Sequence, residues 1–149
     1  QYLKTQLYKP KPSVQTISNA MDVGNPSNFI RIQEIYKNKF ETLKDNVSSF
    51  YFSDNQTKAA MLEIYTKHNY VADPHGAVGY LGAKAYLEHN PNAHCVFLET
   101  AHPTKFLAVV EGVVHKKQAL PKQIQAVMGK EKVATNIATY DDFKKYLLG

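Results

Sequence analysis

The sequence has a single cysteine, Cys95, and no long apolar run. One cysteine has no disulfide partner within the chain, so the disulfide-stapled folds of small secreted proteins are excluded. No apolar stretch approaches the roughly 20 residues that cross a bilayer. The first residues also lack the basic and then apolar pattern of a signal peptide. We therefore expect a cytoplasmic protein with no membrane partner.

Clustered basic residues are lacking as well. The chain carries 18 lysines and arginines against 13 aspartates and glutamates, which gives a formal net charge of +5. These basic residues are scattered, with only short pairs at Lys116-Lys117 and Lys144-Lys145, whereas nucleic-acid binding favours a basic stripe on one face. The composition argues against a nucleic-acid partner and leaves a mild attraction for small anions.

The familiar catalytic motifs are also missing. The sequence has no zinc-ligand spacing, no phosphate-binding Walker loop, no dinucleotide glycine motif and no nucleophile elbow, so we expect no metal site. With 149 residues, of which 44% are hydrophobic, the chain can bury one core. We expect a single unit over residues 1–149 with no internal boundary.

The apolar run from Cys95 to Leu98 organises the rest of the sequence. It is short and apolar at every position, which is typical of a strand buried on both faces, with Cys95 as a small core residue. Thr100, His102 and Lys105 follow it closely. Ligands of α/β folds collect beyond the carboxyl ends of strands, so these residues form a candidate site. The alternative is that Thr100 caps the next helix and His102 is an ordinary loop residue.

Helical spacing of apolar residues recurs on both sides of this run. Helices are expected over six segments, at about 28–40, 54–69, 73–88, 106–113, 121–128 and 141–148. The last helix begins with a capping box at Thr139 and would bury Phe143, Tyr146 and Leu147. A second strand is expected over 47–52. Short strands that alternate with helices are typical of α/β proteins, and because the strands are so few we expect part of a larger domain.

Two more polar stretches lie at the entries of predicted helices, where free backbone amides favour anions. Residues 18–29 contain little to bury, and their candidate site residues are Asp22, Asn25, Ser27 and Asn28. The simpler interpretation of Ser27 is a helix N-cap. Residues 73–79 offer Asp73 and His75, and Asp73 is again an N-cap on the simpler interpretation. The small residues of the helix that follows allow another backbone or a flat ligand to pack closely on it.

Together the three polar stretches resemble the C-terminal half of the threonine synthase family. The matching segments are SNAMDVGNPSNF at 18–29, DPHGAVG at 73–79 and TAHPTKF at 100–106. The resemblance extends from about residue 14 to the end of the chain. Two positions depart from the family pattern: Gly76 stands where many relatives have Thr or Ser, and Thr104 stands where Ala is common.

The resemblance implies an α/β fold, the C-terminal part of a tryptophan-synthase-like (fold type II) pyridoxal-phosphate enzyme with few strands flanked by helices. Such an enzyme converts O-phospho-L-homoserine and water into L-threonine and phosphate, with the carbanion chemistry supplied by pyridoxal 5'-phosphate. In the family, the hydroxyl at the position of Thr100 meets the pyridine nitrogen of the cofactor. The resemblance also implies substrate-side roles for Asp22, Asn25, Ser27, Asn28, Asp73, His75 and Lys105.

The family's Schiff-base lysine and its Gly-Asn-Phe-Gly loop around the cofactor phosphate have no counterpart in this sequence. We expect both to lie upstream of Gln1 in the same polypeptide, so residues 1–149 would hold no catalytic lysine and would turn nothing over alone. Two alternatives stay open. One is another pyridoxal-phosphate lyase of the same fold, and the other is a binding module for a small molecule without catalysis.

Overall fold

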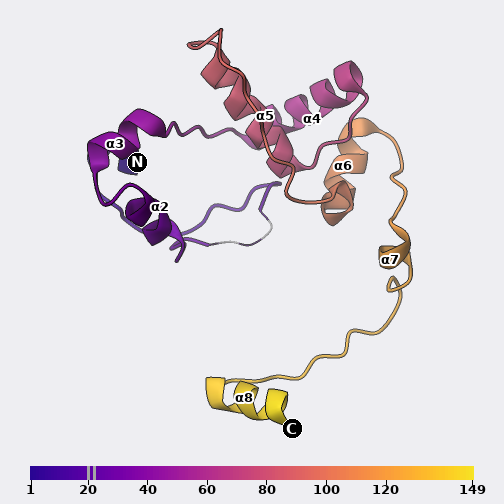
Figure 1. Cartoon of the computed structure of the whole chain (residues 1–149). Coiled ribbons are helices and arrows are strands. Elements are labelled where there is room, and N and C mark those ends of the chain that lie inside the picture. The colour runs from indigo at the N-terminus through magenta and orange to yellow at the C-terminus, as the bar shows by residue number, and fades with distance from the viewer. Residues whose placement is uncertain (20, 22) are drawn as a thin grey trace. The chain divides into compact units, whose positions relative to one another are not determined.

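The computed structural model describes residues 1–19, 21 and 23–149. The chain divides into two compact units, residues 1–118 and residues 119–149 (Figure 1). The helices of the first unit are α1 (Tyr2–Thr5), α2 (Phe29–Ile35), α3 (Phe40–Asn46), α4 (Asp54–His68), α5 (Pro74–Leu87), the 3-10 helix η1 (Pro103–Phe106) and α6 (Leu107–Val114). The second unit has α7 (Lys122–Gln125) and α8 (Tyr140–Leu148). Within the described ranges, every helix is too short or too polar to cross a bilayer.

The expected few-stranded α/β fold is wrong for this structure, because the residues that the structure describes contain helices and no strand. Both predicted strands, 47–52 and 95–98, lack regular secondary structure. A strand forms only where a neighbouring strand pairs its backbone N–H and C=O groups. Neither segment has such a ladder within the described part of the chain, so an apolar composition alone does not make it a strand.

The segment from Cys95 to Leu98 is covered on one face instead of two. Phe97 is half-buried and packs on α5, whereas Val96 is 88% exposed and Leu98 is 74% exposed. Cys95 is exposed as well, so the prediction that it is a small core residue is wrong. Alternate side chains of an extended chain point to opposite faces, and here only the face of Phe97 meets a neighbouring element.

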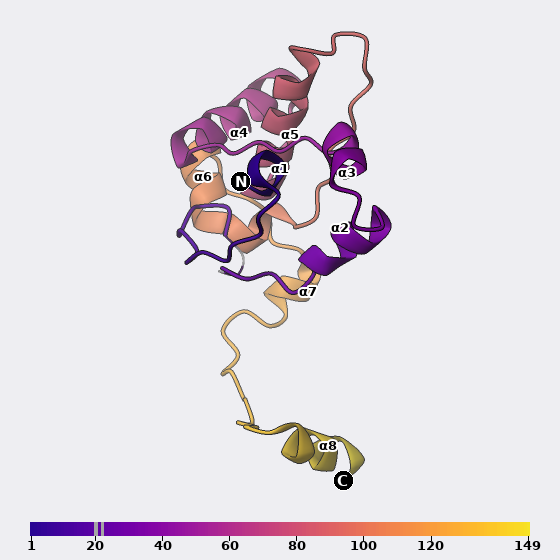
Figure 2. The same ribbon diagram turned by 90° about the vertical axis from the view of Figure 1, so that its left-hand side faces the viewer.

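The core of the first unit lies among α4, α5 and α6, which lie side by side in both Figures 1 and 2. Helix α4 begins with a capping box, in which the Ser53 hydroxyl accepts from the Gln56 amide and the Gln56 side chain accepts from the Ser53 amide. The buried apolar residues that pack together are Ala60, Met61, Ile64, Ala72, Ala77, Val110 and Val114. This cluster fixes where α5 begins, and hence the position of the Asp73–His75 stretch.

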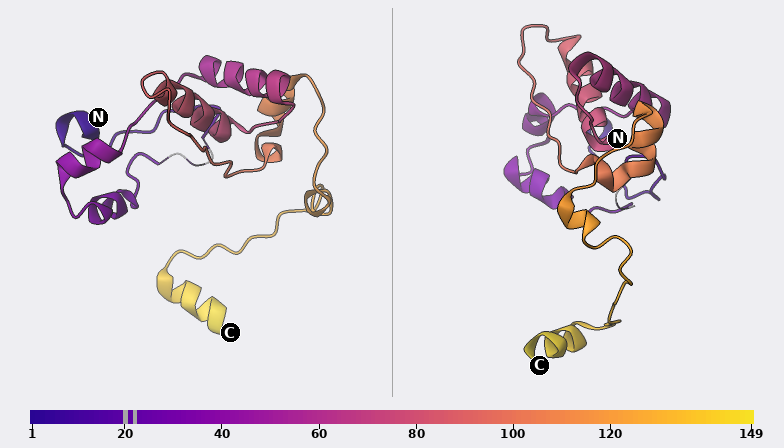
Figure 3. Two further views of the ribbon diagram at one scale, coloured as in Figure 1. Left: turned by 45° about the horizontal axis from the view of Figure 1, so that its top comes forward. Right: turned by 90° about the vertical axis from the view of Figure 1, so that its right-hand side faces the viewer.

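Side chains of the chain itself cover the glycine face of α5. A Cβ at Gly79 would lie 3.4 Å from Cβ of Phe97, and a Cβ at Gly82 would lie 3.6 Å from Cδ2 of Phe50. Near the start of the helix, a Cβ at Gly76 would overlap the carboxyl group of Glu99. The chain that follows α5 therefore turns and runs back along the helix, as Figure 3 shows.

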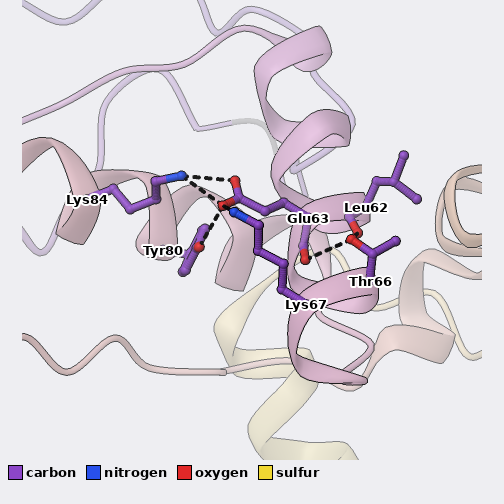
Figure 4. A network of polar contacts seen from close by, with 6 residues as sticks. All are labelled: Leu62, Glu63, Thr66, Lys67, Tyr80 and Lys84. Atoms are coloured by element: carbon purple, nitrogen blue, oxygen red, sulfur yellow. Dashed lines mark hydrogen bonds and ion pairs between the residues drawn. The ribbon is translucent and has the colours of Figure 1, made fainter.

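Glu63 of α4 holds the second half of α5 through Lys84 (Figure 4). Lys84 Nζ of α5 lies 2.9 Å from Glu63 Oε2, and Lys67 Nζ of α4 lies 2.9 Å from Oε1. Tyr80 donates a further hydrogen bond of 3.2 Å to Oε1. These donors, with Lys67 first, lower the pKa of Glu63 to about 2.

The predicted helix over 28–40 is two helices. Helix α2 ends at Ile35, and α3 begins at Phe40. Lys37 and Asn38 lie between them with φ angles of 51° and 56°, in the left-handed region that a right-handed helix cannot continue through. Apolar periodicity carries no information about this backbone break, so the sequence predicted one continuous helix.

In the second unit, helix α8 is capped as its sequence predicts. The Thr139 hydroxyl accepts from the backbone amide of Asp142 at 3.2 Å and donates to the Asp142 carboxylate at 2.7 Å. The predicted burial of its apolar side chains is wrong: Phe143, Tyr146 and Leu147 are 46%, 63% and 64% exposed. None of residues 119–149 is buried, because this unit has no second apolar face to pack on the helix.

Candidate functional site

The first turn of α5 carries a buried acidic cap. Asp73 is 0% exposed and is the N-cap of the helix, as the simpler interpretation of the sequence predicts. Its Oδ1 accepts from the backbone amide of His75 at 2.7 Å and lies 3.0 Å from His75 Nδ1. The cap therefore fixes both the start of α5 and the orientation of the imidazole ring.

Glu99 lies directly against this cap. Its carboxyl group packs on the backbone of Gly76, where any side chain would overlap it. Both Glu99 oxygens and Asp73 Oδ2 are buried and have no hydrogen-bond partner among the described residues. Burial, followed by the neighbouring Asp73 carboxyl, raises the pKa of Glu99 to about 7. Glu99 is therefore largely uncharged below neutral pH and about half ionised near pH 7, although it is an acid.

Tyr70 belongs to the same group of side chains. Burial raises the pKa of its phenol, and the charges of Glu99 and Asp73 raise it further. Tyr70 lies on the segment between α4 and α5. Three acidic side chains from two parts of the chain, the segment before α5 and residue 99, thus lie near the start of α5.

The third polar stretch meets the second at this point. The ring of Phe106 in η1 lies 5.0 Å from the ring of His75, centroid to centroid. Thr100, which directly follows Glu99, is exposed. Lys105 is also exposed, with Nζ 5.9 Å from the centroid of the Phe106 ring. The structure therefore brings residues 73–76 and 99–106 together, with a hydroxyl and an ammonium group available to solvent.

His102 has a local role in this stretch. Its Nδ1 accepts from the backbone amide of Thr104 at 3.2 Å and lies 2.8 Å from the Thr104 hydroxyl, so His102 is the N-cap of η1. The interpretation of His102 as an ordinary loop residue thus has a geometric basis. Thr100 does not cap this helix.

The first polar stretch contacts a different part of the unit. Asn25, Ser27 and Asn28 are all exposed, and Asn25 Oδ1 accepts a 2.9 Å hydrogen bond from the Tyr8 hydroxyl. Asn28, not Ser27, is the N-cap of α2, and its side chain makes no capping hydrogen bond. Asp22 lies outside the described residues. No hydrogen bond within the described ranges links Asn25, Ser27 or Asn28 to α5 or to residues 99–106.

A pocket of about 280 Å³ adjoins the Asp73–Glu99 group, but none of the predicted site residues lines it. Its walls are formed by Ile64, His68, Tyr70, Tyr80 and Phe97. Tyr70 is shared by the pocket and the acidic group. The polar candidates Thr100 and Lys105 thus lie outside this apolar hollow.

The arrangement has three chemical capabilities. The Glu99 carboxyl, when protonated, can donate a hydrogen bond. The exposed Thr100 hydroxyl can donate to or accept from a ligand, and the exposed Lys105 ammonium attracts anions. No group of three potential metal ligands occurs in residues 1–19, 21 and 23–149. Glu99 was not among the residues predicted from sequence. An acid placed directly after an apolar run is the signal that could have identified it.

Sequence comparisons point to one family. The family model described as threonine synthase, C-terminal, matches residues 76–146. The threonine synthase of Buchnera aphidicola subsp. Baizongia pistaciae is 36% identical over 152 residues, covering 99% of this chain and 34% of that protein. The threonine synthase of Haemophilus influenzae is 37% identical over 123 residues, covering 83% of this chain and 28% of that protein. The chain thus spans about a third of the length of these relatives.

Comparison with solved structures agrees. The crystal structure of threonine synthase from Escherichia coli superimposes with a TM-score of 0.81 at 31% identity, covering 99% of this chain and 34% of that one. The structure of PLP-bound threonine synthase from Brucella melitensis, at 22% identity and a TM-score of 0.64, shares the fold. The chain therefore belongs to the threonine synthase family and corresponds to the C-terminal portion of its members.

Proposed function

We propose that this chain is part of the catalytic region of an enzyme that converts O-phospho-L-homoserine and water into L-threonine and phosphate in the cytoplasm, using pyridoxal 5'-phosphate. The observation that carries the proposal is the convergence of two family-like stretches at the start of α5. There the exposed Thr100 directly follows the half-buried Glu99, whose carboxyl packs on Gly76. Residues of the same polypeptide outside this chain would supply the lysine that carries the cofactor.

A hydroxyl donor such as that of Thr100 suits the ring nitrogen at one edge of the cofactor. A ring nitrogen that accepts a hydrogen bond needs a donor, and the Thr100 hydroxyl is exposed and directly follows Glu99, whose pKa is raised to about 7. When bound, pyridoxal phosphate supplies the electron sink for carbanion chemistry. A hydroxyl does not hold the ring nitrogen protonated as a carboxylate would, so Thr100 orients the ring and moderates that sink.

The substrate-side roles divide according to exposure. Lys105 is exposed and can meet the phosphate of the substrate, since a lysine ammonium is a mobile point charge suited to phosphate. Asp73 is buried, so it acts by holding His75 in position. Asn25, Ser27 and Asn28 present their polar groups on an exposed loop. We propose that this loop and Asp22 complete the substrate side.

Substitution of Thr100 in the complete enzyme tests the proposal. Thr100→Val keeps the side-chain volume and removes the hydroxyl, which leaves the ring nitrogen without a partner at a cost of roughly 1–3 kcal/mol. If the cost falls on the transition state, turnover drops about ten- to a hundredfold. Turnover of O-phospho-L-homoserine is measured by phosphate release, and the absorbance of the bound cofactor is recorded alongside.

Two variants serve as controls. Thr100→Ser keeps the hydroxyl and retains most of the turnover. Thr66→Val removes the hydroxyl of an exposed residue of α4 that bonds only to carbonyls of its own helix, so turnover stays unchanged. A Thr100→Val enzyme with the turnover and the cofactor spectrum of the unmutated protein would refute the role given to Thr100.

A further inference from the structure

The carboxyl groups of Asp73 and Glu99 present an imbalance of donors and acceptors. Three of their oxygens, Asp73 Oδ2 and both of Glu99, are buried without a hydrogen-bond donor among the described residues. Buried polar atoms in folded proteins are nearly always paired. Two carboxylates cannot bond each other because an ionised carboxylate only accepts, whereas a protonated one carries a donor. One proton held between the two groups pairs Asp73 Oδ2 with one oxygen of Glu99, and so reduces the unpaired oxygens from three to one.

We propose that Asp73 and Glu99 share one proton, and that this proton holds the chain at Glu99 and Thr100 against the first turn of α5. Glu99 is then a positioning residue for Thr100. The Glu99 carboxyl packs against the backbone of this turn, in the space that a side chain at Gly76 would occupy. The part concerning Thr100 rests on the proposed function, whereas the shared proton does not.

The groups that face Asp73 and Glu99 favour one proton, and hence one negative charge, on the two carboxyls. From α5, His75 engages Oδ1 of Asp73 through its backbone amide and lies 3.0 Å away through Nδ1. From the segment before α5, Tyr70 interacts with both acids. The N-terminus of a helix favours one nearby negative charge, and α5 has 14 residues. A single negative charge on the pair is therefore stabilised, but a second would be buried beside the first.

Removal of the shared proton would put two anions in contact. Coupled acids of this kind release their protons in separate steps, the second at a much higher pH than an isolated carboxyl. Once both are ionised, Glu99, as the flexible partner, moves away from Gly76. Thr100 directly follows Glu99 and loses its fixed position. The pair therefore couples the geometry of the Thr100 segment to pH in the neutral range.

Carboxyl titration tests the shared proton directly. The side-chain carboxyl carbons of the glutamates are labelled with carbon-13 in the complete protein, and their NMR shifts are followed from pH 4 to pH 9. One glutamate signal titrates near neutral pH and disappears in Glu99→Gln. In Asp73→Asn the midpoint moves to lower pH, because the like charge is gone, but stays above that of exposed glutamates, because burial remains. Glu34→Gln on the exposed face of α2 leaves the signal unchanged.

Two results would overturn the shared proton. In one, the Glu99 signal titrates with the exposed glutamates, below about pH 5. In the other, Asp73→Asn leaves its midpoint unmoved. The unmutated protein alone shows whether a glutamate titrates near neutral pH, so this part of the test does not depend on whether a variant folds.

The pH profile of the complete enzyme tests the positioning role. kcat/KM for O-phospho-L-homoserine falls above neutral pH in the unmutated enzyme. Glu99→Gln keeps a donor toward Asp73 at every pH, so this fall is flattened. A variant profile that falls at the same pH as the unmutated one refutes positioning by Glu99. Absence of any threonine synthase activity in the unmutated enzyme would instead refute the proposed function, and the titration would still decide the shared proton.

Discussion

The two halves of helix α5 meet their neighbours through glutamates that behave in opposite ways. Glu63 contacts the second half of α5 through Lys84, within the network of Figure 4, and has its pKa lowered to about 2. Glu99 contacts the first turn through Gly76 and Asp73, and has its pKa raised to about 7. The same side chain is a fixed anion where ammonium groups surround it and a neutral acid where burial and another acid surround it.

Glu63 joins two helices as a structural acid, whereas we propose a positioning role for Glu99. Every oxygen of Glu63 has a donor, with distances of 2.9–3.2 Å to Lys67, Lys84 and Tyr80. Neither oxygen of Glu99 has one among the residues described. An acid without donors in a buried place is destabilising unless it keeps a proton. Glu99, which directly precedes the candidate contact Thr100, is therefore a better indicator of a functional site than Glu63.

The largest effect on the contrast between Glu63 and Glu99 is expected at Asp73. Asp73→Ala removes the N-cap of α5 and the acceptor of the Glu99 proton, and we expect a loss of about 1–2 kcal/mol of unfolding free energy at pH 5. The loss shrinks at pH 8. The reason is that the raised pKa of Glu99 favours folding only while its proton is kept: this contribution is present below the ordinary pKa of 4.5 and is lost as pH rises through about 7.

Urea unfolding at the two pH values measures this difference. Ser53→Ala is the matched control, because Ser53 caps α4 with a hydroxyl that takes no part in the contact with Glu99. Its removal lowers the unfolding free energy by about 1 kcal/mol at both pH values. Equal pH dependence of the two variants would contradict the coupling between Asp73 and Glu99.

A smaller effect is expected at Gly76. In Gly76→Ala the new Cβ displaces the carboxyl of Glu99, which is the flexible end of a side chain and can swing into solvent. The gain in helix propensity is at most about 1 kcal/mol, and the loss of the docked carboxyl offsets it at pH 5. Above pH 7 the variant is more stable than the unmutated chain, because the second buried charge is gone.

Gly112→Ala on α6 provides the reference for this experiment. A Cβ at Gly112 would meet nothing within 4 Å, so alanine stabilises the chain by about 0.5–1 kcal/mol at every pH. Thermal unfolding at pH 5 and pH 8 compares the two variants. A pH-independent gain in Gly76→Ala equal to that of Gly112→Ala would show that the Glu99 carboxyl contributes nothing to docking.

Local signals predicted much of the helical part of this fold. The caps at Asp73 and Thr139 begin helices where the sequence places them, and α4 begins at the predicted residue 54. These signals are short-range, because a cap bonds to amides two or three residues further on. The same locality explains the one predicted helix that is divided: Lys37 and Asn38 adopt positive φ angles that residue type alone does not require.

The predicted strands and the full candidate site depend on long-range contacts. The apolar run at 95–98 indicates that burial is favourable, but it does not indicate which element covers the run. In the structure only Phe97 is covered. The motifs of the family resemblance located residues 73–79 and 100–106, which the structure brings together. The position of Glu99 after an apolar run is a local signal, but its environment comes from Gly76 and Asp73, more than 20 residues earlier, and the sequence does not display that contact.

The smallest expected effect concerns the Glu63 network and tests the structural side of the comparison. Exposed ion pairs contribute about 0.2–1 kcal/mol, and the lysine side chains here are 65% exposed for Lys67 and 45% exposed for Lys84. Lys84 joins α5 to α4, whereas Lys67 lies within α4, so the coupling energy with Glu63 is larger for Lys84. Double-mutant cycles with Glu63→Gln, Lys84→Met and Lys67→Met measure both couplings by urea unfolding.

Salt and pH separate this network from the Asp73–Glu99 pair. Both couplings weaken when the ionic strength is raised toward 1 M, because exposed charges are screened. The lowered pKa of Glu63 means that its contribution is present above the ordinary pKa of 4.5 and is lost as pH falls toward about 2. The pH dependence at Glu63 thus has the opposite sign to that at Glu99. If the Lys84 coupling were lost on raising the pH from 5 to 8, the contrast between the two halves of α5 would be wrong, because Glu63 stays ionised across that whole range.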